Sequence, residues 1–237
     1  MFIIIVYGLI FFDLPSEDDI DSYSPISTVK NTESLTFRLT MPMPVRIYMP
    51  ISRISKDLQL CVITSEDDEF YLHDGVNMNQ VQNVLEESLE KGRLTRGAST
   101  ITMQLARTIY LSNERSLLRK IREIIIAKRI EKVLSKRRIL ELYLNLVEWG
   151  PNIYGIEAAS WYYFDKHADQ LDMAESSLLA SILINPIRFN PHQRLNSAKK
   201  LQQRVLKLLR DSNQITHDEM EYYVSAPLFL RNELTIR

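Results

Sequence analysis

The chain has 237 residues, of which 45% are hydrophobic and 25% charged, and its formal net charge at pH 7 is −1. With six glycines and nine prolines, this composition suits a globular protein and excludes collagen-like and intrinsically disordered classes. The single cysteine, Cys61, excludes an internal disulfide and gives no evidence for a metal cluster.

The small net charge hides a strong segregation of charge along the chain. Residues 1–90 hold fifteen acidic residues against five Lys and Arg, whereas residues 91–139 hold fourteen Lys and Arg against three glutamates. A separate basic block of this kind usually meets an anion, such as phosphate, nucleic acid or an acidic membrane surface. A well-solvated helix face is the alternative.

The N-terminal sequence MFIIIVYGLIFF is apolar and uncharged, but it is shorter than the roughly 20 residues of a membrane-spanning helix. It lacks the preceding positive charge and the small-residue cleavage site of a signal peptide. We expect a short or truncated membrane anchor over residues 1–14, with a buried strand as the alternative. Residues 15–50 form a polar connector, which the prolines at positions 42, 44 and 50 keep extended at its end.

The sequence predicts one helical domain over residues 51–210, followed by a C-terminal extension over residues 211–237. Ile54, Leu58 and Val62 recur every four residues, and later segments keep similar spacing. Ser112 and Ser135 are plausible N-caps of two helices, and the first of these is expected to bury Leu117, Leu118, Ile121, Ile124 and Ile125. The predicted helices include one over residues 81–92, and the predicted fold class is all-α, with a minor extended element near the start.

The helix expected to start at Ser112 carries a column of arginines. Arg115, Arg119 and Arg122 fall within about 60° of one another around the helix, and Glu123 lies about 40° beyond Arg119. Several guanidinium groups on one face suit a pyrophosphate. The alternative is a solvated basic face in which Glu123 is an internal counter-ion.

An acidic cluster at residues 66–69 directly follows an apolar segment. Glu66 is the member that we expect to be partly desolvated, which would favour a role as general base, with Phe70 as a wall of its site. His73 is a base, a ligand or a structural hydrogen-bonding group. The spacing of an EF-hand is missing here, and the Gly-rich segment 92–104 lacks the order of a nucleotide-binding P-loop.

Five motifs in this order resemble the peptidoglycan glycosyltransferase domain, family 51 of the glycosyltransferases. The pattern E-D-x-x-F-x-x-H-x-G occupies residues 66–75, G-A-S-T-I-T-x-Q residues 97–104, and R-K-x-x-E residues 119–123. The pattern S-K-x-x-I-L-E-x-Y-L-N occupies residues 135–145, and a fifth motif runs from Gly155 to Lys166. The match covers roughly residues 50–210.

The resemblance implies a lysozyme-like helical fold and an enzyme that polymerises lipid II into β-1,4-linked glycan strands with inversion, releasing polyprenyl pyrophosphate. It implies that Glu66 is the catalytic base and that Glu123 is a second essential glutamate, holding cations or a divalent metal (Mg or Mn). The positions that it assigns to substrate and pyrophosphate are Asp67, Phe70, His73, Gly97, Ser99, Thr100, Thr102, Gln104, Arg107, Arg115, Arg119, Lys120, Lys136, Glu141 and Asn145.

The implied partners are lipid II, the nascent glycan strand, the membrane and penicillin-binding proteins with transpeptidase activity, and nucleic acid is not among them. The implied location is the bacterial cytoplasmic membrane, with the catalytic domain on its outer side. A lysozyme-type glycan hydrolase and a non-catalytic membrane module that binds anionic ligands are the alternatives.

The chain departs from the family pattern at three positions. Met103 replaces a glutamine, Arg107 replaces a lysine, and Asp165 stands where glycine is common. We do not interpret Met103 and Arg107 as signs of inactivation. Ser197 begins an S-x-x-K sequence, but K-T-G is absent, so no transpeptidase domain is expected.

Overall fold

The computed structural model of the chain describes residues 14–25, 44–78, 82, 99–112, 114 and 116–231. The anchor expected over residues 1–14 and the helix expected over residues 81–92 therefore lie almost entirely outside the described residues. Within the described part, no helix combines the length and the apolar character that crossing a membrane requires.

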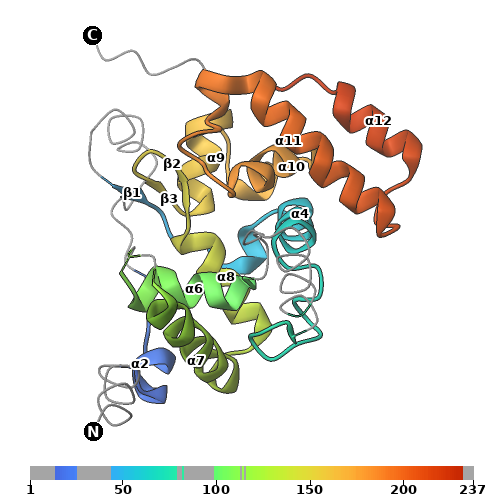
Figure 1. Cartoon of the computed structure of the whole chain (residues 1–237). Helices are drawn as coiled ribbons and strands as arrows, with labels where there is room; N and C mark the ends of the chain where they lie inside the picture. Colours follow the sequence, from blue (N-terminus) through green and yellow to red (C-terminus); the bar gives the residue numbers. More distant parts are fainter. Residues whose placement is uncertain are drawn as a thin grey trace, which may run out of the picture. The chain divides into compact units, whose positions relative to one another are not determined.

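The chain divides into two compact units, and Figure 1 labels their elements. Unit 1 comprises residues 1–24 and 69–143, and unit 2 comprises residues 25–68 and 144–237. Helices dominate the described residues, which confirms the all-α prediction. The elements in chain order are α2 (Glu17–Asp21), β1 (Val45–Arg46), η2 (Ile51–Arg53), α4 (Lys56–Glu66), α6 (Ile101–Tyr110), α7 (Leu117–Val133), α8 (Lys136–Leu146), β2 (Glu148–Gly150), β3 (Ile153–Tyr154), α9 (Ile156–Phe164), η3 (Ala168–Gln170), α10 (Met173–Ile182), α11 (Pro191–Asp211) and α12 (His217–Ser225).

Unit 1 is built on helices α6 and α7, which pack side by side (Figure 1). The hydroxyl of Thr100 accepts a hydrogen bond from the backbone N–H of Met103 and so caps α6. The oxygen of Ser135 accepts one from the backbone N–H of Arg138 at 3.3 Å, as expected of the cap of α8. Both caps lie within predicted motif segments, residues 97–104 and residues 135–145, so the two helices begin inside these motifs.

Helix α7 differs from its prediction at both its start and its buried face. Its N-cap is Ser116 rather than Ser112, which lies just after the end of α6 at Tyr110. Leu117 and Ile121 are exposed, and the buried face is made by Glu123, Ile126, Ala127 and Ile130. Apolar residues occur almost all round this helix, so periodicity alone did not identify the face that α6 covers.

The connector contains a short helix that the sequence did not predict. Ser16 and Asp19 form a reciprocal capping box at the start of α2. Ile20 is buried, α2 packs on α7, and Arg129 donates to the carbonyl of Pro15 at 2.7 Å. Helix α2 is therefore held on α7 by contacts that include the buried Ile20 and the hydrogen bond from Arg129.

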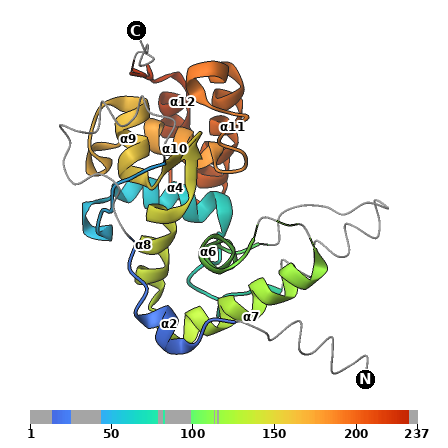
Figure 2. The ribbon, with the colours of Figure 1, turned by 90° about the vertical axis from the view of Figure 1, so that its left-hand side faces the viewer.

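Unit 2 has a helical core around α10, against which α11 and α4 pack, with α12 on α11 (Figure 2). Every residue of α10 is buried. Asp172 caps its start together with Glu175, and the buried face of α11 includes Val205, Leu206 and Leu209. Burial of this apolar surface is the main stabilising term of the unit.

A three-stranded sheet in the order β1-β3-β2 completes unit 2. The extended element expected near the start is confirmed as β1, which pairs with β3 in parallel. The antiparallel hairpin of β2 and β3 was predicted as helix and was missed. Gly155 follows it with a φ of +79°, and a Cβ there would lie 2.7 Å from the carbonyl oxygen of Asn145, so only glycine fits this turn.

Asp165 ends α9 in the left-handed conformation, with a φ of 57°. Glycine is the usual residue at such a position, and Asp tolerates it better than most residues do. Its carboxylate also pairs with the guanidinium of Arg231 at 3.0 Å. The departure from glycine at Asp165 therefore has a local structural explanation.

Candidate active site

A buried carboxylate with two cations forms the centre of the site in unit 1. Glu123 is 1% exposed, and its carboxylate accepts a hydrogen bond from the guanidinium of Arg119, one turn earlier on α7. Lys120 Nζ lies 3.0 Å from Glu123 Oε2 and donates to Ser99 Oγ at 2.6 Å. The structure thus brings together four predicted site residues from the second and third motifs.

The surroundings of Lys120 lower the pKa of its ammonium group. Burial, followed by the positive charges of Arg107 and Arg119, lowers the pKa of Lys120 to about 8. Each of these effects disfavours the ammonium form, and the neighbouring Glu123 does not outweigh them. An anion bound beside Lys120 would relieve the repulsion among the cations, so the cluster is suited electrostatically to a negative ligand.

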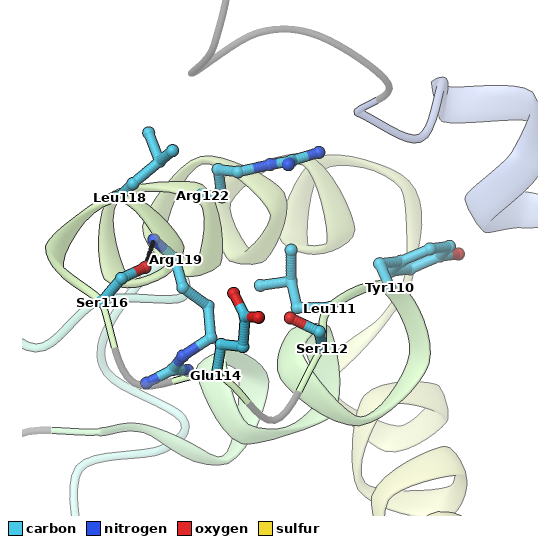
Figure 3. Close-up of a pocket in the computed structure, with 8 residues that line it drawn as sticks. All are labelled: Tyr110, Leu111, Ser112, Glu114, Ser116, Leu118, Arg119 and Arg122. Atoms are coloured by element: carbon cyan, nitrogen blue, oxygen red, sulfur yellow. Dashed lines mark hydrogen bonds between the residues drawn. The ribbon is translucent and has the colours of Figure 1, made fainter.

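A cavity of about 270 Å³ lies beside this cluster, between the end of α6 and the start of α7 (Figure 3). Its volume suits a small anionic group rather than a whole disaccharide, since sites for drug-sized ligands begin near 300 Å³. Arg119 and Arg122 project from α7, while Tyr110 and Ser112 come from the end of α6 and the residues that follow (Figure 3). The lining residues are Tyr110, Leu111, Ser112, Glu114, Ser116, Leu118, Arg119 and Arg122.

The first-motif residues of unit 1 form a loop that Lys136 of the fourth motif holds. Phe70 is fully buried, and Lys136 Nζ lies 4.5 Å from the centroid of its ring. The same ammonium group donates to the carbonyl of His73 at 2.5 Å. His73 Nδ1 in turn accepts from the backbone N–H of Gly75 at 3.1 Å. In these contacts Phe70, His73 and Lys136 maintain the shape of the loop.

The threonines of the second motif also form hydrogen bonds with other residues of the protein. Thr100 Oγ1 donates to the carbonyl of Gly75 at 2.7 Å, and Thr102 Oγ1 donates to Glu131 Oε1 at 2.5 Å. Glu131 belongs to no predicted motif and was missed as a site residue. Its only signal in the sequence was that it is one of three glutamates in the basic block.

Three further predicted site residues have structural partners. Gln104 accepts a hydrogen bond from the hydroxyl of Tyr143 at 3.0 Å, and Glu141 pairs with Arg138. In unit 2, the side-chain amide of Asn145 accepts from Met49 N at 2.7 Å and donates to Met49 O at 2.8 Å. These contacts favour a role in maintaining the fold for Gln104, Glu141 and Asn145.

Glu66 and Asp67 lie in unit 2, at the end of α4. Glu66 is the last residue of the helix and is half-buried, as expected. Asp67 is the most buried of the four consecutive acids, at 1% exposed, and its backbone N–H donates to the carbonyl of Ile63 at 2.9 Å. The sequence predicts the strongest desolvation at Glu66, and this is wrong, since Asp67 is the more buried residue. Joint action of Glu66 and Glu123 stays a prediction.

Gly97 and Arg115, which were also predicted to bind substrate, lie outside the described residues. The residues around Glu123 do not fit the divalent cation predicted there, since its carboxylate already holds Arg119 and Lys120. The described residues contain no group of three or more His, Cys, Asp or Glu arranged to hold a metal ion. No reaction step is therefore assigned to a divalent cation.

A buried glutamate that holds two cations, one of which also binds a serine hydroxyl, is an arrangement suited electrostatically to a negatively charged group. Residues 36–210 match the family model described as transglycosylase. The chain belongs to this transglycosylase family, which confirms the resemblance to peptidoglycan glycosyltransferases.

The most similar relatives include two named biosynthetic peptidoglycan transglycosylase. The protein from Thiobacillus denitrificans is 42% identical, over 69% of this chain and 69% of its own length. The protein from Pasteurella multocida is 44% identical, over 67% of this chain and 64% of its own length. Penicillin-binding protein 1A from Aquifex aeolicus is 33% identical over 94% of this chain, which spans only 31% of that protein.

Proposed function

We propose that this chain polymerises lipid II into peptidoglycan glycan strands with release of polyprenyl pyrophosphate. The observation that carries the proposal is the buried Glu123 with Arg119, Lys120 and Ser99, next to a small cavity that Arg122 also lines. Names of the relatives and the family match point to the same chemistry.

In the proposed reaction, Glu66 takes the proton from the 4-hydroxyl of the acceptor sugar. The hydroxyl oxygen forms a bond to the anomeric carbon of the donor while the bond from that carbon to the pyrophosphate breaks, with inversion. The electron pair of the broken bond leaves on the lipid pyrophosphate. Arg119 and Lys120, held by Glu123, stabilise this developing negative charge, together with Arg107 and Arg115 as further cations.

The proposal places the enzyme at the bacterial cytoplasmic membrane, where its lipid-linked substrate resides, with the catalytic part on the outer side. Lipid II, the nascent strand and penicillin-binding proteins with transpeptidase activity are its proposed partners. A hydrolase of the lysozyme type would have no need for this cluster of cations, because its leaving group is a sugar and not a pyrophosphate.

The test is polymerisation of labelled lipid II by detergent-solubilised protein, with Glu66→Gln as the main variant. We expect polymer from the wild-type protein and a loss of about 100-fold or more in kcat for Glu66→Gln, because the general base is gone. Asp68→Asn is the matched control, since it removes one exposed negative charge from the same acidic cluster. It should leave kcat within about twofold of wild type.

Two outcomes would contradict the proposal. Release of fragments from intact cell wall without polymerisation would indicate a hydrolase. Unchanged activity in Glu66→Gln, with salt-sensitive binding of anions as the only measurable function, would indicate a binding module.

A further inference from the structure

Glu131 lies on α7, two turns beyond Glu123, and outside all five motifs. Its side chain is 6% exposed. One oxygen, Oε1, accepts hydrogen bonds from Thr102 Oγ1 at 2.5 Å and from Lys136 Nζ at 2.7 Å. A single carboxylate on α7 therefore holds a side chain of α6 and a side chain of α8.

Lys136 carries this connection into the first motif. Its ammonium group, besides binding Glu131, donates to the carbonyl of His73 and lies over the ring of Phe70. An ammonium group has three protons and no preferred planar geometry, so its position depends on the acceptors around it. Without the negative charge of Glu131, the carbonyl of His73 and the face of Phe70 would be weaker anchors for it.

The backbone of the first motif also lies directly against Glu131. A Cβ added at Gly75 would lie 3.0 Å from Glu131 Cγ and 2.9 Å from the carbonyl oxygen of Ala127. Thr100 binds the carbonyl of the same glycine. The loop over residues 70–75 is thus held by Lys136, by Thr100 and by close packing on α7.

Stability alone is a weak explanation for this arrangement. A buried ion pair often contributes no more to stability than apolar residues of similar volume, because both charges must be desolvated. What the pair does supply is a fixed place for the Lys136 ammonium, and through it a fixed loop conformation. Unit 2 has a buried pair of the same type, Lys166 with Glu175 at 2.7 Å, in which the acid also caps α10.

We propose that Glu131 is a positioning residue for glycosyl transfer: it holds Lys136 and Thr102 so that the first-motif loop, residues 70–75, keeps its reactive conformation. This inference rests on the proposed function. It assigns Glu131 no contact with substrate, and it predicts an effect on turnover rather than on substrate affinity.

The experiment measures the melting temperature, and kcat and KM for lipid II, in wild type, Glu131→Gln, Glu175→Gln and the double variant Glu131→Gln/Lys136→Met. Kinetics are measured well below each melting temperature, so that every protein is folded. Glu175→Gln is the matched control, because it neutralises an equally buried acid paired with lysine in unit 2. We expect both single variants to lose melting temperature to a similar extent.

In Glu131→Gln we expect kcat to fall about 30-fold to 100-fold, because a small misplacement of reacting groups has an effect of this size, while KM stays within about threefold. Glu175→Gln should keep the wild-type kcat. In the double variant, removal of the uncompensated lysine should restore melting temperature but not kcat, since methionine cannot form the hydrogen bond of Lys136 to the carbonyl of His73.

A purely structural role predicts the opposite pattern, in which kcat returns with stability in the double variant. That result, or a wild-type kcat in Glu131→Gln, would overturn the inference while the wild-type protein still polymerises lipid II. Absence of polymer from the wild-type protein would instead reject the proposed function, and the positioning role with it.

Discussion

Buried glutamates have different partners in the two compact units. In unit 1, Glu123 holds Arg119 and Lys120, and Glu131 holds Thr102 and Lys136. All of these partners are side chains. In unit 2, Glu157 accepts from the backbone N–H of Ala168 at 2.8 Å as well as from two side chains, and Glu175 accepts from the backbone N–H of Asp172 at 3.2 Å.

This difference separates two uses of a buried carboxylate. An acid that binds backbone N–H groups satisfies donors that would otherwise be buried without a partner, so its main contribution is to folding. An acid that binds only cations and hydroxyls fixes groups that can also reach a ligand, so its main contribution is to the site. Changes to the acids of unit 1 should therefore impair activity more than stability, and changes in unit 2 should do the reverse.

Glu123→Gln is the strongest test of this difference. The two carboxylate oxygens separately contact Arg119 and Lys120, and a glutamine would present an NH₂ group to one of these cations. We expect kcat for lipid II polymerisation to fall about 100-fold to 1,000-fold, the range seen when one oriented electrostatic group is removed from an active site. The melting temperature should fall only slightly, because both cations are partly exposed and can be hydrated.

If Glu123→Gln instead strongly lowered the melting temperature while the folded protein kept its wild-type kcat, the acids of unit 1 would be structural and the difference between the units would not hold. Circular dichroism melting and a lipid II assay on the same preparation distinguish these results.

Glu157→Gln tests whether a buried acid of unit 2 contributes mainly to stability. Glu157 Oε1 accepts from Trp161 Nε1 at 3.0 Å, and Oε2 accepts from the N–H of Ala168. A glutamine must place its NH₂ group against one of these donors, and a buried donor without an acceptor costs about 1–3 kcal/mol. We expect the free energy of unfolding in urea to fall by about 2 kcal/mol.

The polymerisation rate per folded molecule of Glu157→Gln should equal that of wild type. A tenfold loss of kcat without loss of stability would show that this acid serves the reaction. The simple division between the two units would then need revision.

The sequence predicted the members of the charge cluster in unit 1 better than the contacts that support it. The four-residue spacing of Leu58 and Val62 correctly predicted α4, but Ile54, which shares this spacing, lies before the helix in an extended conformation. The motifs included Glu123 and its neighbouring cations. Glu131 was missed because its partners lie on α6 and at the start of α8, and a pairing between helices leaves no regular spacing within one helix.

The errors on α7 have a related cause. Leu117 and Ile121 were expected to be buried, yet they are exposed, while the charged Glu123 is buried. Periodicity identifies which residues share a helix face, but burial depends on what packs against that face. A buried acid is acceptable here only because cations from the same helix accompany it. That compensation is visible in the structure and not in the pattern.

The pH dependence of anion binding is the smallest effect that we predict, and it tests the cation side of the cluster in unit 1. The pKa of Lys120 is lowered from 10.5 to about 8, so this side chain carries its charge below about pH 8 and loses it above. Affinity for inorganic pyrophosphate, measured by calorimetry, should therefore fall as pH rises from 7 to 9, by up to about tenfold. In Lys120→Arg the guanidinium keeps its charge throughout this range, and the decline should be absent or much weaker.

Pyrophosphate itself titrates identically in both experiments, so the difference between wild type and Lys120→Arg reports Lys120. The stability of the protein should change in the other direction. Between about pH 8 and 10.5 the unfolded chain binds the Lys120 proton and the folded chain does not, so this group raises the free energy of unfolding as pH increases. If affinity for pyrophosphate falls with pH while the free energy of unfolding rises, the charged form of Lys120 favours anion binding and destabilises the folded protein. Equal pH profiles for the two proteins would remove Lys120 from the anion site.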